Sequence, residues 1–173
     1  AVKTEAKNDP RETTGLAHYF EHMMFKGTDK IATQDWEIEG AYIQEISDLF
    51  ELRCETEDLD VKAEIYSQID SVSQLASNYA IANEYDKICS VIGATGTNAW
   101  TSYEETVYVN EIPANEIERW LKTESERFEN MVLRLFHTEL ETVFEEFNMG
   151  QDRDGRKSFT KLMAEMFQSH LYG

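Results

Sequence analysis

The sequence predicts an α+β fold, in which several helices pack against a small antiparallel or mixed β-sheet. Apolar side chains recur at helical spacing through most of the 173 residues. One stretch between residues 93 and 113 instead gathers small, β-branched and aromatic residues, which is typical of a β-hairpin. With 41% hydrophobic residues and only 2 Pro, the composition is that of a folded globular chain. At this length we expect one domain over residues 1–173, and an incomplete one.

The N-terminal segment contains the first helix that the pattern predicts. Residues 1–9 alternate weakly and could be the end of a strand. Asp9-Pro10 followed by Thr13-Thr14 indicates a turn that leads into a helix cap. The helix itself is predicted over residues 15–26, and Gly27 is well placed to terminate it.

Residues 36–80 are expected to form a helical hairpin. Apolar residues repeat every three or four positions over 33–54, and the pattern resumes up to Tyr79 after the acidic break at 55–58. The outer faces of both predicted helices are charged, which is more often a solvated helix face than a binding surface for a partner.

The second half of the chain alternates between helix and strand signals. A short helix is predicted near residues 83–92, and strands are predicted near 97–102 and 105–110. Pro113 opens an amphipathic helix whose expected core stripe consists of Ile117, Trp120, Leu121 and Phe128. Two more helices are predicted over about 137–151 and 156–168, the first of them with the apolar stripe Leu140, Val143, Phe144 and Phe147.

Charge and cysteine content exclude several classes of protein. The 34 acidic and 16 basic residues give a net charge of −18, so nucleic acid is not expected as a partner. No run of 18 apolar residues occurs, and therefore no membrane span is expected. The two cysteines, Cys54 and Cys89, lack a Cys-x-x-Cys spacing, which excludes a cysteine-rich zinc module and leaves one disulfide or two buried thiols as alternatives.

The first predicted helix carries a candidate metal site. His18, Glu21 and His22 are spaced i, i+3 and i+4, so one turn of helix presents all three on one face. Two imidazoles one turn apart can share a zinc ion, and His-x-x-Glu-His is the inverzincin order of the zincin motif. The alternative is an amphipathic helix whose two histidines are buried and hydrogen-bonded.

A hydrolytic zinc site needs a third protein ligand and an open position for water. The remaining histidines, His137 and His170, are candidates for that ligand. So are the carboxylates of a later helix, in which Glu139 and Glu146 lie on one flank of the apolar stripe and Glu141 and Glu145 on the other. Periodicity does not choose between the two flanks.

Three blocks of the sequence resemble one known family. TTGLAHYFEHMMFKGT, GTNAWTSYEETVY and ELETVFEEF occur in the order found in the N-terminal catalytic domain of the pitrilysin and insulysin type of zinc metallopeptidases. The resemblance implies a zinc-dependent endopeptidase that binds one zinc ion per chain. It also implies a domain in which helices pack on a sheet.

The resemblance assigns roles to particular residues. It implies that His18, His22 and Glu146 bind zinc, that Glu21 is the general base toward a zinc-activated water, and that Glu139 supports a ligand. The hairpin resembles the family's edge strand, onto which a peptide substrate adds as a further strand. Asn98, Ala99, Trp100 and Thr101 are the candidates for substrate contacts.

The chain also departs from the family pattern. The segment between His22 and Glu146 is longer than usual, and the excess falls in the helical hairpin of residues 36–80, which resembles a bacterial subset of the family. Surface insertions of this kind cost little when their ends lie close together. Family members close two halves around the substrate, so a C-terminal half or a second subunit is the expected partner besides the peptide.

Two other classes of function stay open. One is a non-catalytic zinc-binding or scaffold domain that completes a dimer or heteromer, although the intact Glu21 argues against it. The other is an acidic helical interaction module without metal, which would make three matching blocks a coincidence. The compartment is also open, with an exported bacterial protein slightly favoured over a cytoplasmic one.

Overall fold

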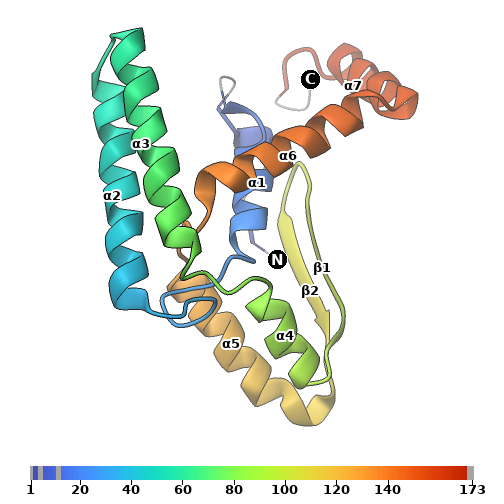
Figure 1. The fold of residues 1–173 in the computed structure, drawn as a ribbon. Coiled ribbons are helices and arrows are strands. Elements are labelled where there is room, and N and C mark those ends of the chain that lie inside the picture. The colour runs from blue at the N-terminus through green and yellow to red at the C-terminus, as the bar shows by residue number, and fades with distance from the viewer. Residues whose placement is uncertain (1, 4–5, 11–12, 171–173) are drawn as a thin grey trace.

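The computed structural model describes residues 2–3, 6–10 and 13–170, and these form an α+β fold of seven α-helices and one two-stranded sheet (Figure 1). The predicted class of helices packed around an antiparallel sheet is thus confirmed. In chain order the elements are α1 Leu16–Met23, α2 Trp36–Glu55, α3 Leu59–Ser77, α4 Glu84–Val91, β1 Thr95–Thr101, β2 Thr106–Glu111, α5 Ile117–Glu129, α6 Phe136–Gln151 and α7 Asp154–Met166, with short 3-10 turns at Ala6–Asn8 and Ala114–Glu116.

Helices α2 and α3 stand side by side as the predicted hairpin, on the opposite side of the molecule from the sheet (Figure 1). Asp35 caps α2, because its carboxylate accepts a hydrogen bond from the backbone N–H of Ile38. The base of the hairpin is closed by a β-bridge between Thr33 and Ala80. The chain therefore enters and leaves the hairpin at neighbouring points.

The sheet consists of β1 and β2, which pair antiparallel with Thr101 opposite Thr106. Val2 forms an isolated bridge with Thr106 on the other side of β2. Within the described residues β1 thus pairs along one edge only. The expectation that residues 1–9 contain the end of a strand is met at Val2, which bridges to β2, and is wrong over 6–8, which form a 3-10 turn; residues 1 and 4–5 lie outside the description.

Helix α1 begins with a cap that comes from Asp9, seven residues before its first residue. The Asp9 carboxylate accepts from the backbone N–H groups of Gly15, at 2.8 Å, and of Ala17, at 3.2 Å. These are among the N–H groups that a helix N-terminus leaves without intrahelical partners. The expected cap at Thr13-Thr14 is thus replaced by a more distant one. The predicted end of this helix is wrong, because α1 stops at Met23 with Met24 as its C-cap; Gly27, with a left-handed backbone of φ 96°, lies in the loop that follows.

The predicted core stripe of α5 is wrong. Ile117 and Leu121 are about half exposed, at 51% and 52%, and Phe128 is also exposed. The buried face of α5 instead carries Arg127, whose guanidinium pairs with Glu124 at 2.6 Å and lies over four aromatic rings: Phe25, Tyr85, Tyr108 and Phe128. A paired guanidinium can be buried on aromatic faces, and it occupies the position that the pattern assigns to apolar residues.

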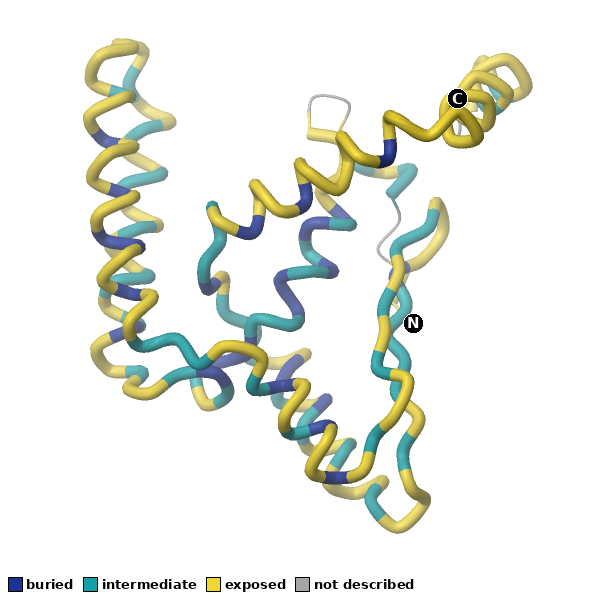
Figure 2. Tube along the Cα trace, turned by 45° about the vertical axis from the view of Figure 1, so that its right-hand side comes forward, coloured by how far each residue is buried: buried dark blue, intermediate teal, exposed yellow. Residues whose placement is uncertain are grey.

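The stripe predicted for α6 is only partly buried. Val143 packs with Tyr19 and Met23 of α1, but Leu140, Phe144 and Phe147 are exposed. In Figure 2 most of the tube along α6 and α7 is coloured as exposed, whereas α1 contains a series of buried positions. The apolar face of α6 therefore has little protein against it within the described chain.

The cysteines are free thiols. Cys89 is buried and Cys54 is exposed, so the expectation of a disulfide is not met and that of two buried thiols is wrong for Cys54. No helix in the described part of the chain combines the length and the apolar character that crossing a bilayer requires.

Candidate metal centre

Helices α1 and α6 build the candidate site by crossing each other (Figure 1). Tyr19 of α1 packs on Val143 of α6, and its hydroxyl donates a 2.6 Å hydrogen bond to the carbonyl oxygen of Phe136. The neighbouring residues of α1, His18 and His22, then face the carboxylates of α6. Apolar packing on one side of α1 thus fixes how its histidines meet the second helix.

The two histidines and Glu146 form one compact group of possible ligands. His18 Nε2 lies 3.2 Å from His22 Nε2, and Glu146 Oε2 lies 3.7 Å and 3.6 Å from these two nitrogens. Ligand atoms on a tetrahedral zinc ion, at bond lengths of about 2.0–2.1 Å, lie about 3.3 Å apart. The three side chains therefore fit zinc in both spacing and chemistry.

Glu139 contacts the ring nitrogen of His22 that faces away from His18 and Glu146. Its Oε1 lies 2.9 Å from His22 Nδ1, and its Oε2 lies 2.5 Å from the Lys26 ammonium. Burial raises the pKa of Glu139, but the hydrogen bonds and charges of Lys26 and His22 outweigh it, so the pKa lies below its usual range. An ionised Glu139 accepts the Nδ1 proton, which leaves the lone pair of His22 on Nε2, the atom that faces His18 and Glu146.

Glu21 lies beside this group but points toward the sheet. It is buried, and its Oε2 accepts a 2.6 Å hydrogen bond from the hydroxyl of Thr101, the last residue of β1. Burial, together with the negative charge of Glu21, raises the pKa of Tyr108 to about 12. The carboxylate is thus fixed between α1 and the end of β1.

The other predicted substrate residues lie along β1. Asn98 and Trp100 are exposed, and Ala99 is half-buried. The Asn98 side-chain oxygen accepts a hydrogen bond from the N–H of Ala99 at 2.9 Å. Thr101 differs from these three because its hydroxyl faces Glu21.

The other candidate third ligands lie apart from the two histidines of α1. His137 Nε2 is 3.5 Å from Asp70 of α3, and the His170 ring packs beside Phe167. Glu141 and Glu145 are exposed on α6. Among the described residues one set of three or more possible ligands comes together, and it consists of His18, His22 and Glu146.

Two features near the site were missed by the sequence interpretation. Lys26 follows His22 by four residues, and this helical spacing could have suggested that both contact one carboxylate. The second feature is Arg134, which is buried and pairs with the fully buried Glu39 of α2. No spacing signal links these two residues, because 95 positions separate them.

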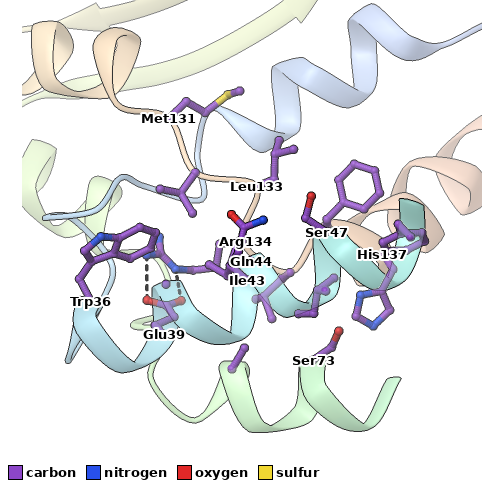
Figure 3. Close-up of a pocket in the computed structure, with 17 residues that line it drawn as sticks. Trp36, Glu39, Ile43, Gln44, Ser47, Ser73, Met131, Leu133, Arg134 and His137 are labelled. Carbon is purple, nitrogen blue, oxygen red and sulfur yellow. Dashed lines mark hydrogen bonds and ion pairs between the residues drawn. The ribbon is translucent and has the colours of Figure 1, made fainter. Parts of the chain in front are cut away.

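Arg134 and Glu39 also form one wall of a pocket of about 520 Å³ at the base of the hairpin (Figure 3). Its lining is mainly apolar and comes from α2, α3 and the 131–137 segment, with Trp36, Ile43, Phe50 and Leu133 among its members. This pocket lies between the hairpin and the segment that leads into α6.

Comparison with known families bears on the segment that contains the histidines. Fold and site together define an α+β chain with a candidate metal centre of two histidines and a carboxylate. Residues 1–43 match the model of the insulinase family, peptidase family M16. The match includes His18, Glu21 and His22, and it confirms the resemblance over that segment, at the level of a peptidase family. No curated protein matches the chain.

Proposed function

We propose that this chain is the N-terminal catalytic domain of a zinc-dependent endopeptidase. The observation that carries the proposal is the meeting of His18, His22 and Glu146, whose ligand atoms all lie within 4.8 Å of one another, beside the buried Glu21. The family match over residues 1–43 supports the same class of reaction. Zinc is the metal that two imidazoles and a carboxylate most often hold in hydrolytic enzymes.

Each residue of the site has a role in the proposed mechanism. His18, His22 and Glu146 would hold zinc, which when bound supplies a Lewis acid and lowers the pKa of a coordinated water to about 7. Glu21 takes a proton from the attacking water and returns it to the leaving amine nitrogen. Glu139 keeps the Nδ1 proton on His22, and Lys26 balances the charge of Glu139.

The proposed substrate is an extended peptide that adds to the edge of β1. Support comes from the strand pairing, because within the described residues β2 covers only one edge of β1. Asn98, Ala99, Trp100 and Thr101 are the residues nearest to such a peptide in this proposal. Backbone pairing gives affinity with little dependence on side chains, so we expect broad sequence tolerance.

A second half or a second subunit is part of the proposal. The apolar side chains left exposed on α5 and α6, among them Leu121, Phe144 and Phe147, favour a further protein surface over them. These exposed faces also keep a second candidate function open, a zinc-binding scaffold that is active only in a complex. The helical hairpin of residues 36–80 is proposed as an insertion in this one domain, since its ends meet at the Thr33–Ala80 bridge.

The test begins with zinc content by elemental analysis of the chain and of His22→Ala, with His170→Ala as a matched control. We expect about one zinc per chain, lost in His22→Ala and kept in His170→Ala. No zinc in the unmodified chain after added metal would contradict the site.

The second part of the test uses Glu21→Gln and a fluorogenic peptide. We expect this variant to keep its zinc and to lose hydrolysis, since only the base is removed. Retained cleavage by the purified variant would contradict the role of Glu21. Zinc binding without cleavage in the unmodified chain would favour the scaffold function.

A further inference from the structure

Thr101 makes a contact that substrate binding does not explain. It is the last residue of β1, and its hydroxyl donates a 2.6 Å hydrogen bond to Glu21 Oε2, across 80 positions of sequence. The Thr106 hydroxyl lies 3.1 Å from the same Thr101 oxygen, because the two threonines are directly opposite in the sheet register. The carboxylate is therefore connected to both strands.

The direction of these hydrogen bonds follows from the groups involved. An ionised carboxylate only accepts, so Thr101 donates its single hydroxyl proton to Glu21. Thr101 Oγ1 then accepts from the hydroxyl of Thr106, which is buried. The chain of hydroxyls thus runs from Thr106 through Thr101 to Glu21, and a hydrogen bond to an ionised acceptor is stronger than one between two neutral groups.

We propose that Thr101 is a positioning residue for Glu21. The inference rests on the proposed function, in which Glu21 is the general base. Because Thr101 binds Oε2 of Glu21, Oε1 is the oxygen that accepts the proton from water. The same hydrogen bond restricts rotation of the carboxylate, so the two oxygens do not exchange places freely. Proton transfer by a positioned base depends on its geometry relative to the reacting water.

The position of Thr101 in the sheet gives this contact a second consequence. Thr101 ends the strand to which the peptide is proposed to add, so the base is fixed to the same strand that aligns the substrate backbone. Movement of β1 would carry the base along with the peptide. The distance between the scissile carbonyl and Glu21 is thereby held by one hydrogen bond.

The experiment compares Thr101→Val, which keeps the shape and loses the hydroxyl, with Thr101→Ser, which keeps the hydroxyl. Thr95→Val, at an exposed position of the same strand, is the matched control. In peptide hydrolysis we expect Thr101→Val to lower kcat by about 10- to 100-fold with little change in KM, and Thr101→Ser to recover most of it. Zinc content is expected to stay the same in all three.

A second readout does not depend on activity. In metal-free protein labelled with ¹³C, the Glu21 side-chain carboxyl resonance is identified by its loss in Glu21→Gln. We expect Thr101→Val to shift this resonance, Thr101→Ser to restore it, and Thr95→Val to leave it in place. Thr106→Val, which removes the next hydroxyl, is expected to give a smaller shift in the same direction.

The outcomes separate the positioning role from the proposed function. A raised KM with unchanged kcat in Thr101→Val would make Thr101 a substrate contact and overturn the proposal. An unmoved carboxyl resonance, or a serine variant that behaves like the valine variant, would also overturn it. If the unmodified chain binds zinc but cleaves no peptide, the scaffold function is favoured over hydrolysis by this chain alone, and the carboxyl resonance decides whether Thr101 orients Glu21.

Discussion

The buried ion pair between Glu39 and Arg134 gives the strongest prediction about stability. The Arg134 guanidinium uses all five N–H groups: two bind the Glu39 carboxylate, and three bind the carbonyl oxygens of Lys26, Thr28 and Ile31. Glu39 is fully buried and Arg134 is only 3% exposed. Replacing Glu39 with Met would leave the guanidinium buried with three carbonyl partners and no carboxylate opposite it.

The expected cost follows from that loss. Removal of one partner of a buried pair typically destabilises a protein by about 3–5 kcal/mol, because the other charge stays desolvated. For a domain of this size each kcal/mol lowers Tm by about 2–4 °C, so we expect Glu39→Met to lower Tm by about 6–20 °C. Glu39→Gln keeps the shape and one acceptor, and it should lie between this variant and the unmodified chain.

Urea and thermal unfolding followed by circular dichroism measure the effect. Glu37→Met is the matched control, because Glu37 lies in the same turn of α2 but is exposed; its change should stay within about 1 kcal/mol. A double variant with Met at both Glu39 and Arg134 should recover part of the loss. If Glu39→Met costs no more than Glu37→Met, the reasoning from the buried pair is refuted.

Three further predictions concern a turn, the thiols and the support of His22. Gly27→Ala should cost about 1–3 kcal/mol in urea unfolding, because φ is 96° and a Cβ would lie 2.3 Å from a backbone oxygen; an unchanged midpoint would contradict this. A thiol reagent at pH 8 should modify Cys54 rapidly and Cys89 only after unfolding, since burial both shields Cys89 and raises its pKa, which lowers its thiolate fraction; equal rates would refute it. Glu139→Gln should weaken zinc binding about 10- to 100-fold in a chelator competition, and Lys26→Met should weaken it less. A larger loss of zinc affinity in Lys26→Met than in Glu139→Gln would refute the role given to Glu139.

Local patterns predicted most of the secondary structure. The hairpin of α2 and α3 and the pairing of β1 with β2 follow from periodicity and turn signals close together in the chain. The first helix was also predictable, but its cap was not. Asp9 reaches across a turn whose path depends on the folded chain, whereas Thr13-Thr14 has the usual sequence of a cap.

The errors in α5 and α6 have a common physical cause. Periodicity shows that a helix has an apolar stripe, but it does not show whether the described chain covers that stripe. Leu121 and Phe144 belong to such stripes and are exposed, whereas Arg127 is buried because Glu124 and aromatic rings surround it. An ion pair within the helix, packed against aromatic rings from other parts of the chain, thus reverses the usual assignment of charged residues to the surface.

In the candidate site, too, local spacing was predictable from the sequence, and contacts between distant elements were not. The spacing of His18 and His22 within one helical turn was visible in the sequence, whereas Glu139 and Glu146 were expected only from the family resemblance. Periodicity left the two flanks of α6 equal, and only the crossing of α6 over α1 brings Glu139 and Glu146 to the histidines. The Thr101 contact with Glu21 depends on where β1 ends against α1, a tertiary relation without a sequence pattern.

The Thr33–Ala80 bridge makes the helical hairpin look removable, since the chain could pass from one residue to the other without spanning a gap. Yet Glu39 lies inside the hairpin, and its carboxylate neutralises Arg134, which also binds the carbonyl oxygen of Lys26 just after α1. A deletion that preserved the path of the chain would leave that charge buried without its partner. The neighbouring ends of the hairpin would thus allow it to be deleted, but the deletion would leave the buried charge of Arg134 unpaired. Any shortened form of this domain would therefore have to replace Arg134 as well as remove the hairpin.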